Sequence, residues 1–547
     1  MICWPMKSND MKLKKDYEKA GFALLFLVMA VYYGYRMFAL TPWYDELYTY
    51  YYFVSRGPVY AAVHWPLPNN HVGYSVLSGF LDYFGNSYIG LRGISYLCAL
   101  FNMGLLFNIG RHFFPRGLSL IAVIFYISMN LVNQMAVQGR GYTLGVTCYL
   151  TAFACLLCLC QEEKDKKRYY IIYAFSLVLG LYTLTSDVYW VLPVCFTGGI
   201  YLLYRGIIEA REKKEKLIQS TSIKKLIKLI AASLAAAVVT VGLYTVIWLA
   251  IGSNLLVKEQ NGSFSGMGHV EVILKAPFKA IGTGMEYMLA TPYIQSVERA
   301  GFISRLGNWF MTLFNWYYDG AAWLILMLLL FGIICLICRI VKGVRKKEKE
   351  SILLPVFLLV GILCMPLFLI IQCALPYYRV FVYGGVLLAL LLVFLVQQTI
   401  ESAARLNPGI NQNKAAKAIT GGAALAAFLV AVISFGCKDY QNQYSMREYY
   451  IQDALAHSNI RQAENLCVTD CTQQYLIKFL YDIACENTQI ENADMVLLDK
   501  KMTDPDFQEM EWEFYHYYST VPWDYINGSM EKIYENDSFV LYEKIND

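Results

Sequence analysis

Repeated runs of about 20 apolar residues, separated by short charged loops, constrain this chain more than any other feature. Each run is long enough to cross a hydrocarbon core about 30 Å thick. Hydrophobic residues make up 57% of the chain and charged residues only 16%, which is more apolar surface than a water-soluble core encloses. We count eleven runs, which begin near Lys19, Tyr88, Leu118, Tyr142, Tyr169, Val188, Leu226, Ala321, Ile352, Val380 and Ile419. The sequence therefore predicts an α-helical polytopic membrane protein with about 11 transmembrane helices.

The basic residues between these runs predict the orientation of the chain. If the N-terminus is cytoplasmic, the inner segments carry 28 lysines and arginines and the outer loops carry eight. Inner loops are normally the basic ones, so this orientation satisfies the positive-inside rule. Eleven crossings then place the C-terminus outside. We expect a multi-pass protein of the plasma or inner membrane, embedded in the lipid bilayer.

The outer segments divide the chain into two predicted domains. Residues 1–436 form the membrane domain, with long outer loops at 41–87 and 253–320. Residues 437–547 predict a small extracytoplasmic α/β domain, with strands at 465–468, 495–498 and 538–542 and a helix at 473–484. This tail carries a net charge of −13, which repels phosphate and argues against a nucleic-acid partner.

The cysteines give no metal site on spacing alone. Cys155-x-x-Cys158 and Cys335-x-x-Cys338 have zinc-like spacing. They lie in apolar runs, where a charged metal centre is costly, so we interpret them as packing residues. The outer cysteines Cys437, Cys467, Cys471 and Cys485 could form disulfides, and the sequence does not give a pairing.

Two adjacent carboxylates follow the first apolar run, in the segment Trp43-Tyr44-Asp45-Glu46. A carboxylate pair at a membrane surface can act as a general base with its neighbour, or hold a cation. It can also be a solvated turn, because such residues are usually exposed. All three interpretations remain open on sequence grounds.

A second polar segment, His64-Trp65-Pro66-Leu67-Pro68-Asn69-Asn70-His71, leads into the second apolar run. Its prolines and paired asparagines predict a rigid polar corner. His71 could bind a metal or donate a hydrogen bond to a ligand. The alternative is a structural histidine whose hydrogen bonds are satisfied within the fold.

Two arginines stand where apolar runs begin on the outer side. Gln138-Gly139-Arg140-Gly141-Tyr142 opens one run and Pro376-Tyr377-Tyr378-Arg379 opens another. Glycines allow a ligand to approach the backbone, a helix N-terminus favours anions, and a guanidinium group suits phosphate. Arg140 could instead extend toward lipid headgroups. Together with the carboxylate pair, these residues favour a phosphate-bearing, lipid-linked substrate attacked from the aqueous side.

Three motifs in this order and on this side resemble bacterial GT-C glycosyltransferases. They are Asp45-Glu46, Pro68-Asn69-Asn70-His71 and Gly139-Arg140-Gly141-Tyr142. The resemblance is to the protein O-mannosyltransferase and aminoarabinose-transferase branch, in which a Pro-Pro-Leu-Tyr-like segment often stands where this chain has 68–71. The motifs cover roughly residues 41–151, and the membrane topology covers the whole membrane part.

The resemblance implies a hexosyltransferase-type enzyme that moves a sugar from a polyprenyl-phosphate donor to an outer-face acceptor, with inversion. The acceptor could be a protein, a lipid or a glycan. The resemblance makes Asp45 the base that takes the acceptor proton, with Glu46 beside it. It assigns the leaving lipid phosphate to Arg140 first and Arg379 second, with Tyr142 nearby. Asn70 and His71 become acceptor or metal candidates, and Glu46 with His71 could hold a divalent cation.

A transporter or flippase of a lipid-linked glycan is the competing class. Transporters place charges near the bilayer midplane on broken, repeated helices. Here the charged candidates stand at helix ends and the sequence has no visible repeat, which favours the enzyme. The chain also has no glycine-rich nucleotide fingerprint, which disfavours a nucleotide-sugar donor.

Overall fold

The computed structural model of the chain describes most of the 547 residues. The described ranges are 17–64, 70–161, 165–252, 301–348, 351–406, 412–437, 445–483, 485–486, 490–503 and 521–545, with short helical pieces between 270 and 282. Residues 65–69 of the predicted polar corner and most of residues 253–300 of the second outer loop lie outside them.

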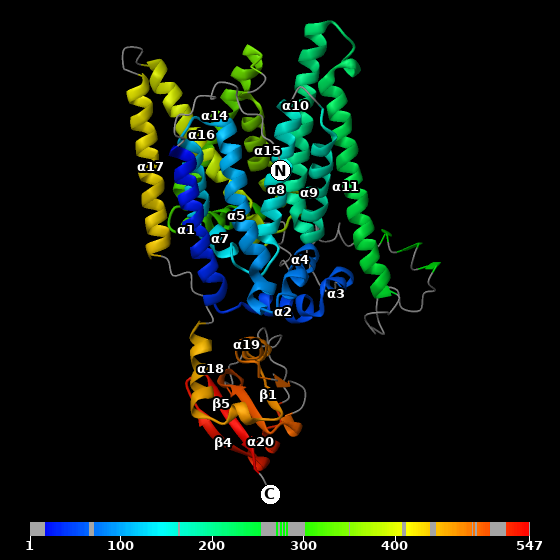
Figure 1. Cartoon of the computed structure of the whole chain (residues 1–547), viewed down its shortest axis with the longest axis vertical. Coiled ribbons are helices and arrows are strands. Elements are labelled where there is room, and N and C mark those ends of the chain that lie inside the picture. The colour runs from blue at the N-terminus through cyan, green and yellow to red at the C-terminus, as the bar shows by residue number, and fades with distance from the viewer. Residues whose placement is uncertain are drawn as a thin grey trace.

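Most of the molecule is a bundle of long helices running roughly side by side (Figure 1). Among the described residues, nine helices are long and apolar enough to cross a membrane. These are α1 (Tyr17–Ala39), α5 (Ser87–Phe113), α8 (Tyr142–Gln161), α10 (Val188–Lys213), α11 (Thr221–Gly252), α14 (Ala322–Lys346), α15 (Leu353–Gln372), α16 (Gly384–Leu406) and α17 (Gln412–Cys437). The prediction of an α-helical multi-pass membrane protein is confirmed, whereas the orientation of its termini stays a prediction.

The two remaining predicted spans are helical but shorter than expected. Helix α9 (Lys167–Thr183) has 17 residues, and α6 (Leu118–Ile127) has 10. Helix α6 stops at Ser128, after which the chain turns into α7 (Asn130–Met135). Arg36 Nη1 of α1 donates a 2.9 Å bond to the Asn133 carbonyl within α7, which ties α7 to α1.

Short helices replace the first long outer loop. They are α2 (Tyr44–Tyr52), η1 (Val54–Arg56), α3 (Pro58–Val63) and α4 (Val72–Asp82), all gathered at one end of the bundle (Figure 1). The second outer region contributes α13 (Phe302–Tyr317), and η5 (Tyr378–Phe381) precedes α16. Two further turns, η2 (Thr185–Asp187) and η3 (Leu217–Gln219), flank α10 and α11. The candidate residues of the sequence lie in or beside these short elements.

The C-terminal part is a five-stranded mixed sheet with helices, confirming the predicted α/β tail. Its elements are α18 (Ser445–His457), η6 (Ile460–Gln462), β1 (Leu466–Val468), α19 (Cys471–Tyr481), β2 (Cys485–Glu486), η7 (Ile490–Asn492), β3 (Met495–Asp499), η8 (Lys500–Thr503), α20 (Trp523–Ser529), β4 (Met530–Glu535) and β5 (Phe539–Lys544). The strand order is β2-β1-β3-β5-β4, with β1 parallel to β2 and β3, and β5 antiparallel to β3 and β4. This part lies beyond the end of the bundle that carries α2, and α19 faces α2 (Figure 1).

The cysteines differ in burial where the structure describes them. Cys155 and Cys158 are buried, Cys335 is half-buried and Cys338 is exposed. Cys467 is buried and Cys485 half-buried, on neighbouring strands. Leu466, not Cys467, is the register partner of Cys485, so the two thiols point to opposite faces of the sheet.

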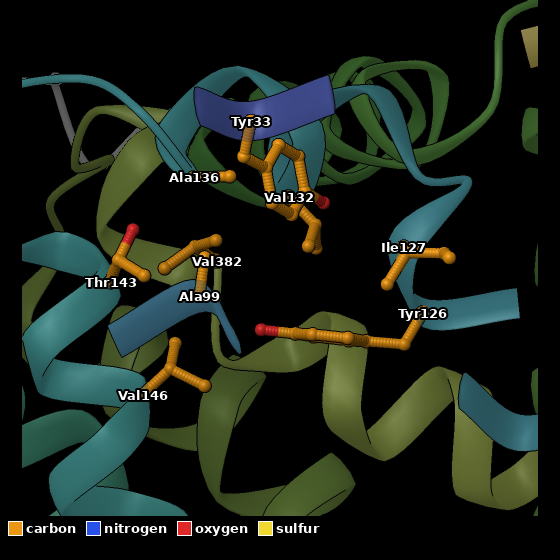
Figure 2. A pocket seen from close by; sticks show the side chains of 9 residues that line it. All are labelled: Tyr33, Ala99, Tyr126, Ile127, Val132, Ala136, Thr143, Val146 and Val382. Atoms are coloured by element: carbon orange, nitrogen blue, oxygen red, sulfur yellow. The ribbon is translucent and has the colours of Figure 1, made fainter. Parts of the chain in front are cut away.

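The interior of the bundle is closely packed. A small cavity lies between α1, α5, α6, α7 and α8, with Tyr33 and Tyr126 turning their rings into it from different sides (Figure 2). Its lining is completed by Ala99, Ile127, Val132, Ala136, Thr143, Val146 and Val382. At about 10 Å³ it has room for one water at most. It is too small for a substrate.

Candidate active site

Helix α2 begins immediately after the first membrane helix and carries both predicted carboxylates in its first turn. The Trp43 backbone N–H donates to Glu46 Oε2 at 2.9 Å, which satisfies one free N–H group at the helix start. Acidic residues in a first turn also complement the helix dipole. The sequence Trp43-Tyr44-Asp45-Glu46 therefore favours a helix start at this point, rather than the solvated turn that the sequence left open.

Both carboxylate oxygens of Glu46 accept hydrogen bonds within the fold. Its side chain is only 2% exposed and forms a two-pronged ion pair with Arg92 of α5, at 2.8 Å from Nε to Oε1 and 3.0 Å from Nη2 to Oε2. The Gly139 N–H donates to the same Oε1 at 2.6 Å. Glu46 therefore ties α2 to α5 and to the turn before α8.

Arg92, the partner of Glu46, also binds the end of α1. Its Nη1 donates to the carbonyls of Met37 and Leu40, at 3.0 and 2.7 Å, where α1 ends. These carbonyls have no partner within the helix, so the guanidinium group caps α1 while it holds Glu46. One buried arginine thus sets where α1 stops and where α2 starts.

Asp45 faces outward and meets a second arginine. The Arg379 Nη2 lies 3.1 Å from Asp45 Oδ2, and the two side chains are 28% and 21% exposed. The Arg379 Nε donates to the Tyr142 hydroxyl at 2.8 Å. The structure thus brings together three predicted site residues from α2, α8 and η5. Asp45 and Arg379 are both partly open to solvent and both carry charge.

Arg140 lies behind Asp45 and is almost entirely enclosed. Its side chain is 4% exposed, and its Nη1 donates to Thr49 Oγ1 at 2.6 Å and to the Asp45 carbonyl at 3.2 Å. A buried guanidinium group bound to α2 is not one that extends to lipid headgroups. Arg140 instead anchors the backbone of the residue that carries the exposed carboxylate.

His71 lies next to Arg140 and is hydrogen-bonded within the fold. The Gly141 N–H donates to His71 Nδ1 at 2.8 Å, so a neutral ring carries its proton on Nε2. The Arg140 Nη2 lies 3.0 Å from that Nε2, so two donors meet there. Burial, and then the charges of Arg140 and Arg379, hold the pKa of His71 well below its usual 6.5. His71 is therefore neutral at physiological pH.

Asn70 holds the polar corner closed. Its side chain is 2% exposed, and its Nδ2 donates to the carbonyls of Ala61 and His64 at 3.0 and 2.6 Å. These bonds join the end of α3 to the start of α4. Asn70 therefore shapes the loop, and it lies beside His71 without reaching the group formed by Asp45 and Arg379 in any described contact.

The residues suggested for a divalent cation do not fit one. Both oxygens of Glu46 accept N–H groups, from Arg92 and Gly139 on one and from Arg92 and Trp43 on the other. His71 Nδ1 accepts a backbone N–H, and its other nitrogen faces a guanidinium group. Within the described ranges, no group of three or more His, Cys, Asp or Glu side chains could hold a metal ion.

Sequence reasoning missed two residues that build this site. Arg92 lies inside an apolar run, and an arginine there is itself a signal of a functional or structural partner. Thr49 lies one turn after Asp45 on α2, where its hydroxyl donates to the Asp45 carbonyl at 2.8 Å and accepts from Arg140. Its spacing of four residues places it on the same helix face as Asp45.

The sequence matches a family model over residues 71–248, described as dolichyl-phosphate-mannose-protein mannosyltransferase. This stretch contains His71, Arg92, Arg140 and Tyr142, which the structure joins around α2. The chain resembles the GT-C glycosyltransferases. The match supports a glycosyltransferase and leaves the sugar and the acceptor open. A comparison with curated protein sequences found no match.

Solved structures of two GT-C enzymes are similar to this chain. ArnT from Cupriavidus metallidurans bound to undecaprenyl phosphate is 10% identical, with a TM-score of 0.48 over 96% of this chain and 99% of that one. The oligosaccharyltransferase from Archaeoglobus fulgidus in complex with zinc and sulfate is 12% identical, with a TM-score of 0.49 over 89% of this chain and 69% of that one.

Proposed function

We propose that this GT-C-like protein transfers a sugar, of hexose type, from a polyprenyl-phosphate donor to an acceptor on the outer face, with inversion. The observation that carries the proposal is the pairing of an accessible carboxylate, Asp45, with an accessible guanidinium group, Arg379, at 3.1 Å. One group can take a proton and the other can bind a phosphate. The family match over residues 71–248 supports the class of reaction.

In the proposed step, Asp45 removes the proton of an acceptor hydroxyl as its oxygen attacks the anomeric carbon. A carbon–oxygen bond to the acceptor forms while the bond to the lipid phosphate breaks. The bonding pair and the growing negative charge leave on the phosphate. Asp45 suits the role because its carboxylate is partly exposed, while Thr49 and Arg140 hold its backbone carbonyl in place.

Arg379 is the group we assign to the leaving phosphate. The Arg379 side chain is 28% exposed, whereas Arg140 is 4% exposed and bound to α2. We therefore propose Arg379 before Arg140, the reverse of the order that the motifs suggested. In this assignment the charge of Arg140 adds positive potential at the site. Its bond to the Asp45 carbonyl positions Asp45. Three guanidinium groups face two carboxylates here, and the excess positive charge favours an incoming anion.

The contact between Arg140 and His71 also supports an anionic ligand. Both groups present N–H donors at a separation of 3.0 Å once the His71 proton is on Nε2. A phosphate oxygen that reaches this point would accept from both.

The acceptor, whether protein, lipid or glycan, approaches the solvent-exposed part of the Asp45 carboxylate in this proposal. A divalent cation is not needed to bind the phosphate in this proposal, because the guanidinium groups supply the charge. The competing transporter would use charges within the bundle. One buried charged group of the bundle, Arg92, is already paired with Glu46 and caps α1.

The decisive test compares Asp45→Asn with Asp524→Asn in detergent-solubilised protein supplied with polyprenyl-phosphate sugars and no membrane gradient. Asp524 lies in the first turn of α20 and is exposed, so it controls for loss of one surface charge. We expect Asp45→Asn to lower turnover at least 10²-fold with the lipid donor still bound. Normal turnover in Asp45→Asn would exclude it as the base, and a gradient-dependent reaction would favour the transporter.

A further inference from the structure

Helix α2 is held on two sides by different parts of the chain. On the bundle side, Glu46 and Thr49 bind Arg92 and Arg140. On the other side, α19 of the C-terminal domain lies against it (Figure 1). Leu47 of α2 is fully buried and belongs to the apolar core that α19 forms with β1, β3 and β5. Helix α2, which carries Asp45, therefore packs into the core of the C-terminal domain.

Tyr475 of α19 is the centre of this contact. Its ring stacks on Tyr51 with ring centres 5.6 Å apart, and its centre lies 6.0 Å from that of Tyr52 and 6.3 Å from that of Tyr44. Its hydroxyl donates to the Tyr52 hydroxyl at 3.0 Å. One side chain therefore touches both the first and the last turn of α2.

Phe479, one turn later in α19, extends the contact toward the bundle. Its ring meets Tyr50 of α2 and Tyr88 of α5 edge to face, with ring centres 5.4 and 5.0 Å apart. The Lys478 ammonium group lies 4.8 Å from the centre of the Tyr51 ring. Aromatic pairs of this geometry contribute beyond the area that they bury. α19 is thus joined to α2 and also to the helix that carries Arg92.

Helix α2 is short, so its position depends on these contacts. It has nine residues, and a helix this short is not stable alone in water. Its position is set by the groups that hold it, and an error of about 1 Å in a catalytic group can cost about 10² in rate. Arg92 and Arg140 of the bundle bind the face of α2 that carries Glu46 and Thr49. Among the described elements, only α19 makes aromatic contacts with the other side of α2.

We infer that the C-terminal domain positions the base of the reaction, with Tyr475 and Phe479 acting as positioning residues for Asp45. The inference rests on the proposed function. Neither side chain touches the proposed reacting atoms. They hold α2 at the angle at which Asp45 meets Arg379, so the domain acts on turnover and leaves the site of the lipid phosphate on Arg379 unchanged.

The test compares Tyr475→Ala with Tyr475→Phe and Tyr525→Ala in the full chain. Phenylalanine keeps the ring contacts and loses only the hydroxyl bond to Tyr52. Tyr525 of α20 packs on the other core of the same domain, where its hydroxyl donates to the Glu491 carbonyl at 3.0 Å. It is a matched tyrosine that does not contact α2 in the structure.

We expect Tyr475→Ala to lower turnover by about 10-fold or more, while the KM for the lipid donor stays within about two-fold. Tyr475→Phe should keep turnover within about three-fold of the wild type, because the rings still stack. Tyr525→Ala should leave turnover at the wild-type level. Equal turnover in Tyr475→Ala and Tyr525→Ala would overturn the inference.

Hydrogen exchange in the same proteins gives a readout independent of activity. In Tyr475→Ala, amides of α2 should exchange faster while those of α1 stay unchanged. Unchanged exchange in α2 would overturn the inference, whatever the activity. If the wild type transfers no sugar from any polyprenyl-phosphate donor, the proposed function fails, and the exchange result alone then decides whether α19 holds α2.

Discussion

Arg379 Nη2 lies 3.1 Å from Asp45 Oδ2, and this ion pair joins the first outer helix to the turn before α16. The same guanidinium group donates to Tyr142 at the start of α8. Arg379, itself in η5, therefore contacts two other parts of the fold, α2 and α8, while it stays partly exposed. A phosphate that binds it would compete with Asp45, so donor binding would leave the carboxylate free to accept a proton.

The two arginines should respond differently to substitution. Arg379→Ala should lower turnover by about 10² to 10³, with little change in the thermal midpoint, because Arg379 is partly solvated. Arg140→Lys should lose about 1–3 kcal/mol of transition-state stabilisation, since one ammonium group cannot reach Thr49, Asp45 and His71 together. Kinetics and thermal unfolding in one detergent measure both effects. Unchanged turnover in Arg379→Ala would assign the phosphate to Arg140.

Glu46→Gln should destabilise the fold. Four N–H donors converge on the two oxygens of Glu46, so the amide NH₂ of glutamine would face two of them without an acceptor. Breaking a buried ion pair from one side costs about 3–5 kcal/mol. Glu401→Gln is the matched control, because its pair with Arg339 is partly exposed and should cost less than about 1 kcal/mol. Similar thermal midpoints for the two variants would contradict the structural role of Glu46.

His71 should make stability fall at acidic pH. Its pKa is lowered in the folded protein, so below 6.5 the unfolded chain binds a proton that the folded chain does not. The stability contributed by the neutral ring is therefore complete above pH 6.5 and declines as the pH falls toward the folded pKa, by at most about 1.4 kcal/mol per pH unit. His71→Asn keeps an acceptor for Gly141 and should flatten this dependence between pH 6.5 and 5. Parallel melting curves for both proteins would show that His71 does not titrate on unfolding.

Gly141→Ala should be destabilising by about 1–3 kcal/mol. A methyl group there would lie 2.4 Å from Thr183 Cγ2 and 3.1 Å from His71 Nδ1, so the histidine that faces Arg140 would have to move. Gly104→Ala in α5 is the control, because nothing lies within 4 Å of its added carbon. The control should be neutral or slightly stabilising in a thermal unfolding assay. Equal midpoints in the two variants would mean that His71 tolerates displacement.

The sequence predicted the helical bundle because a long apolar run indicates a membrane-spanning helix without knowledge of the tertiary fold. Each of the eleven apolar runs contains a helix in the structure. The run from Leu118 looked long enough to span, yet α6 ends after 10 residues and the separate helix α7 follows, whose Asn133 carbonyl binds Arg36 of α1. Strand β4 (Met530–Glu535) was missed because its alternating charges resemble a loop, and only pairing with β5 makes it a strand.

The sequence by itself determined the membrane class, the α/β tail and several of the residues that lie around α2, because hydropathy, charge and motif order are properties of local segments. Only the tertiary structure decided what each residue does there. Glu46 became a buried partner of Arg92, Arg140 an anchor of α2, and Arg379 the accessible guanidinium group. The sequence did not predict the contact of Tyr475 with α2 either. Exposure and pairing depend on which distant segments pack together, and no local pattern records that.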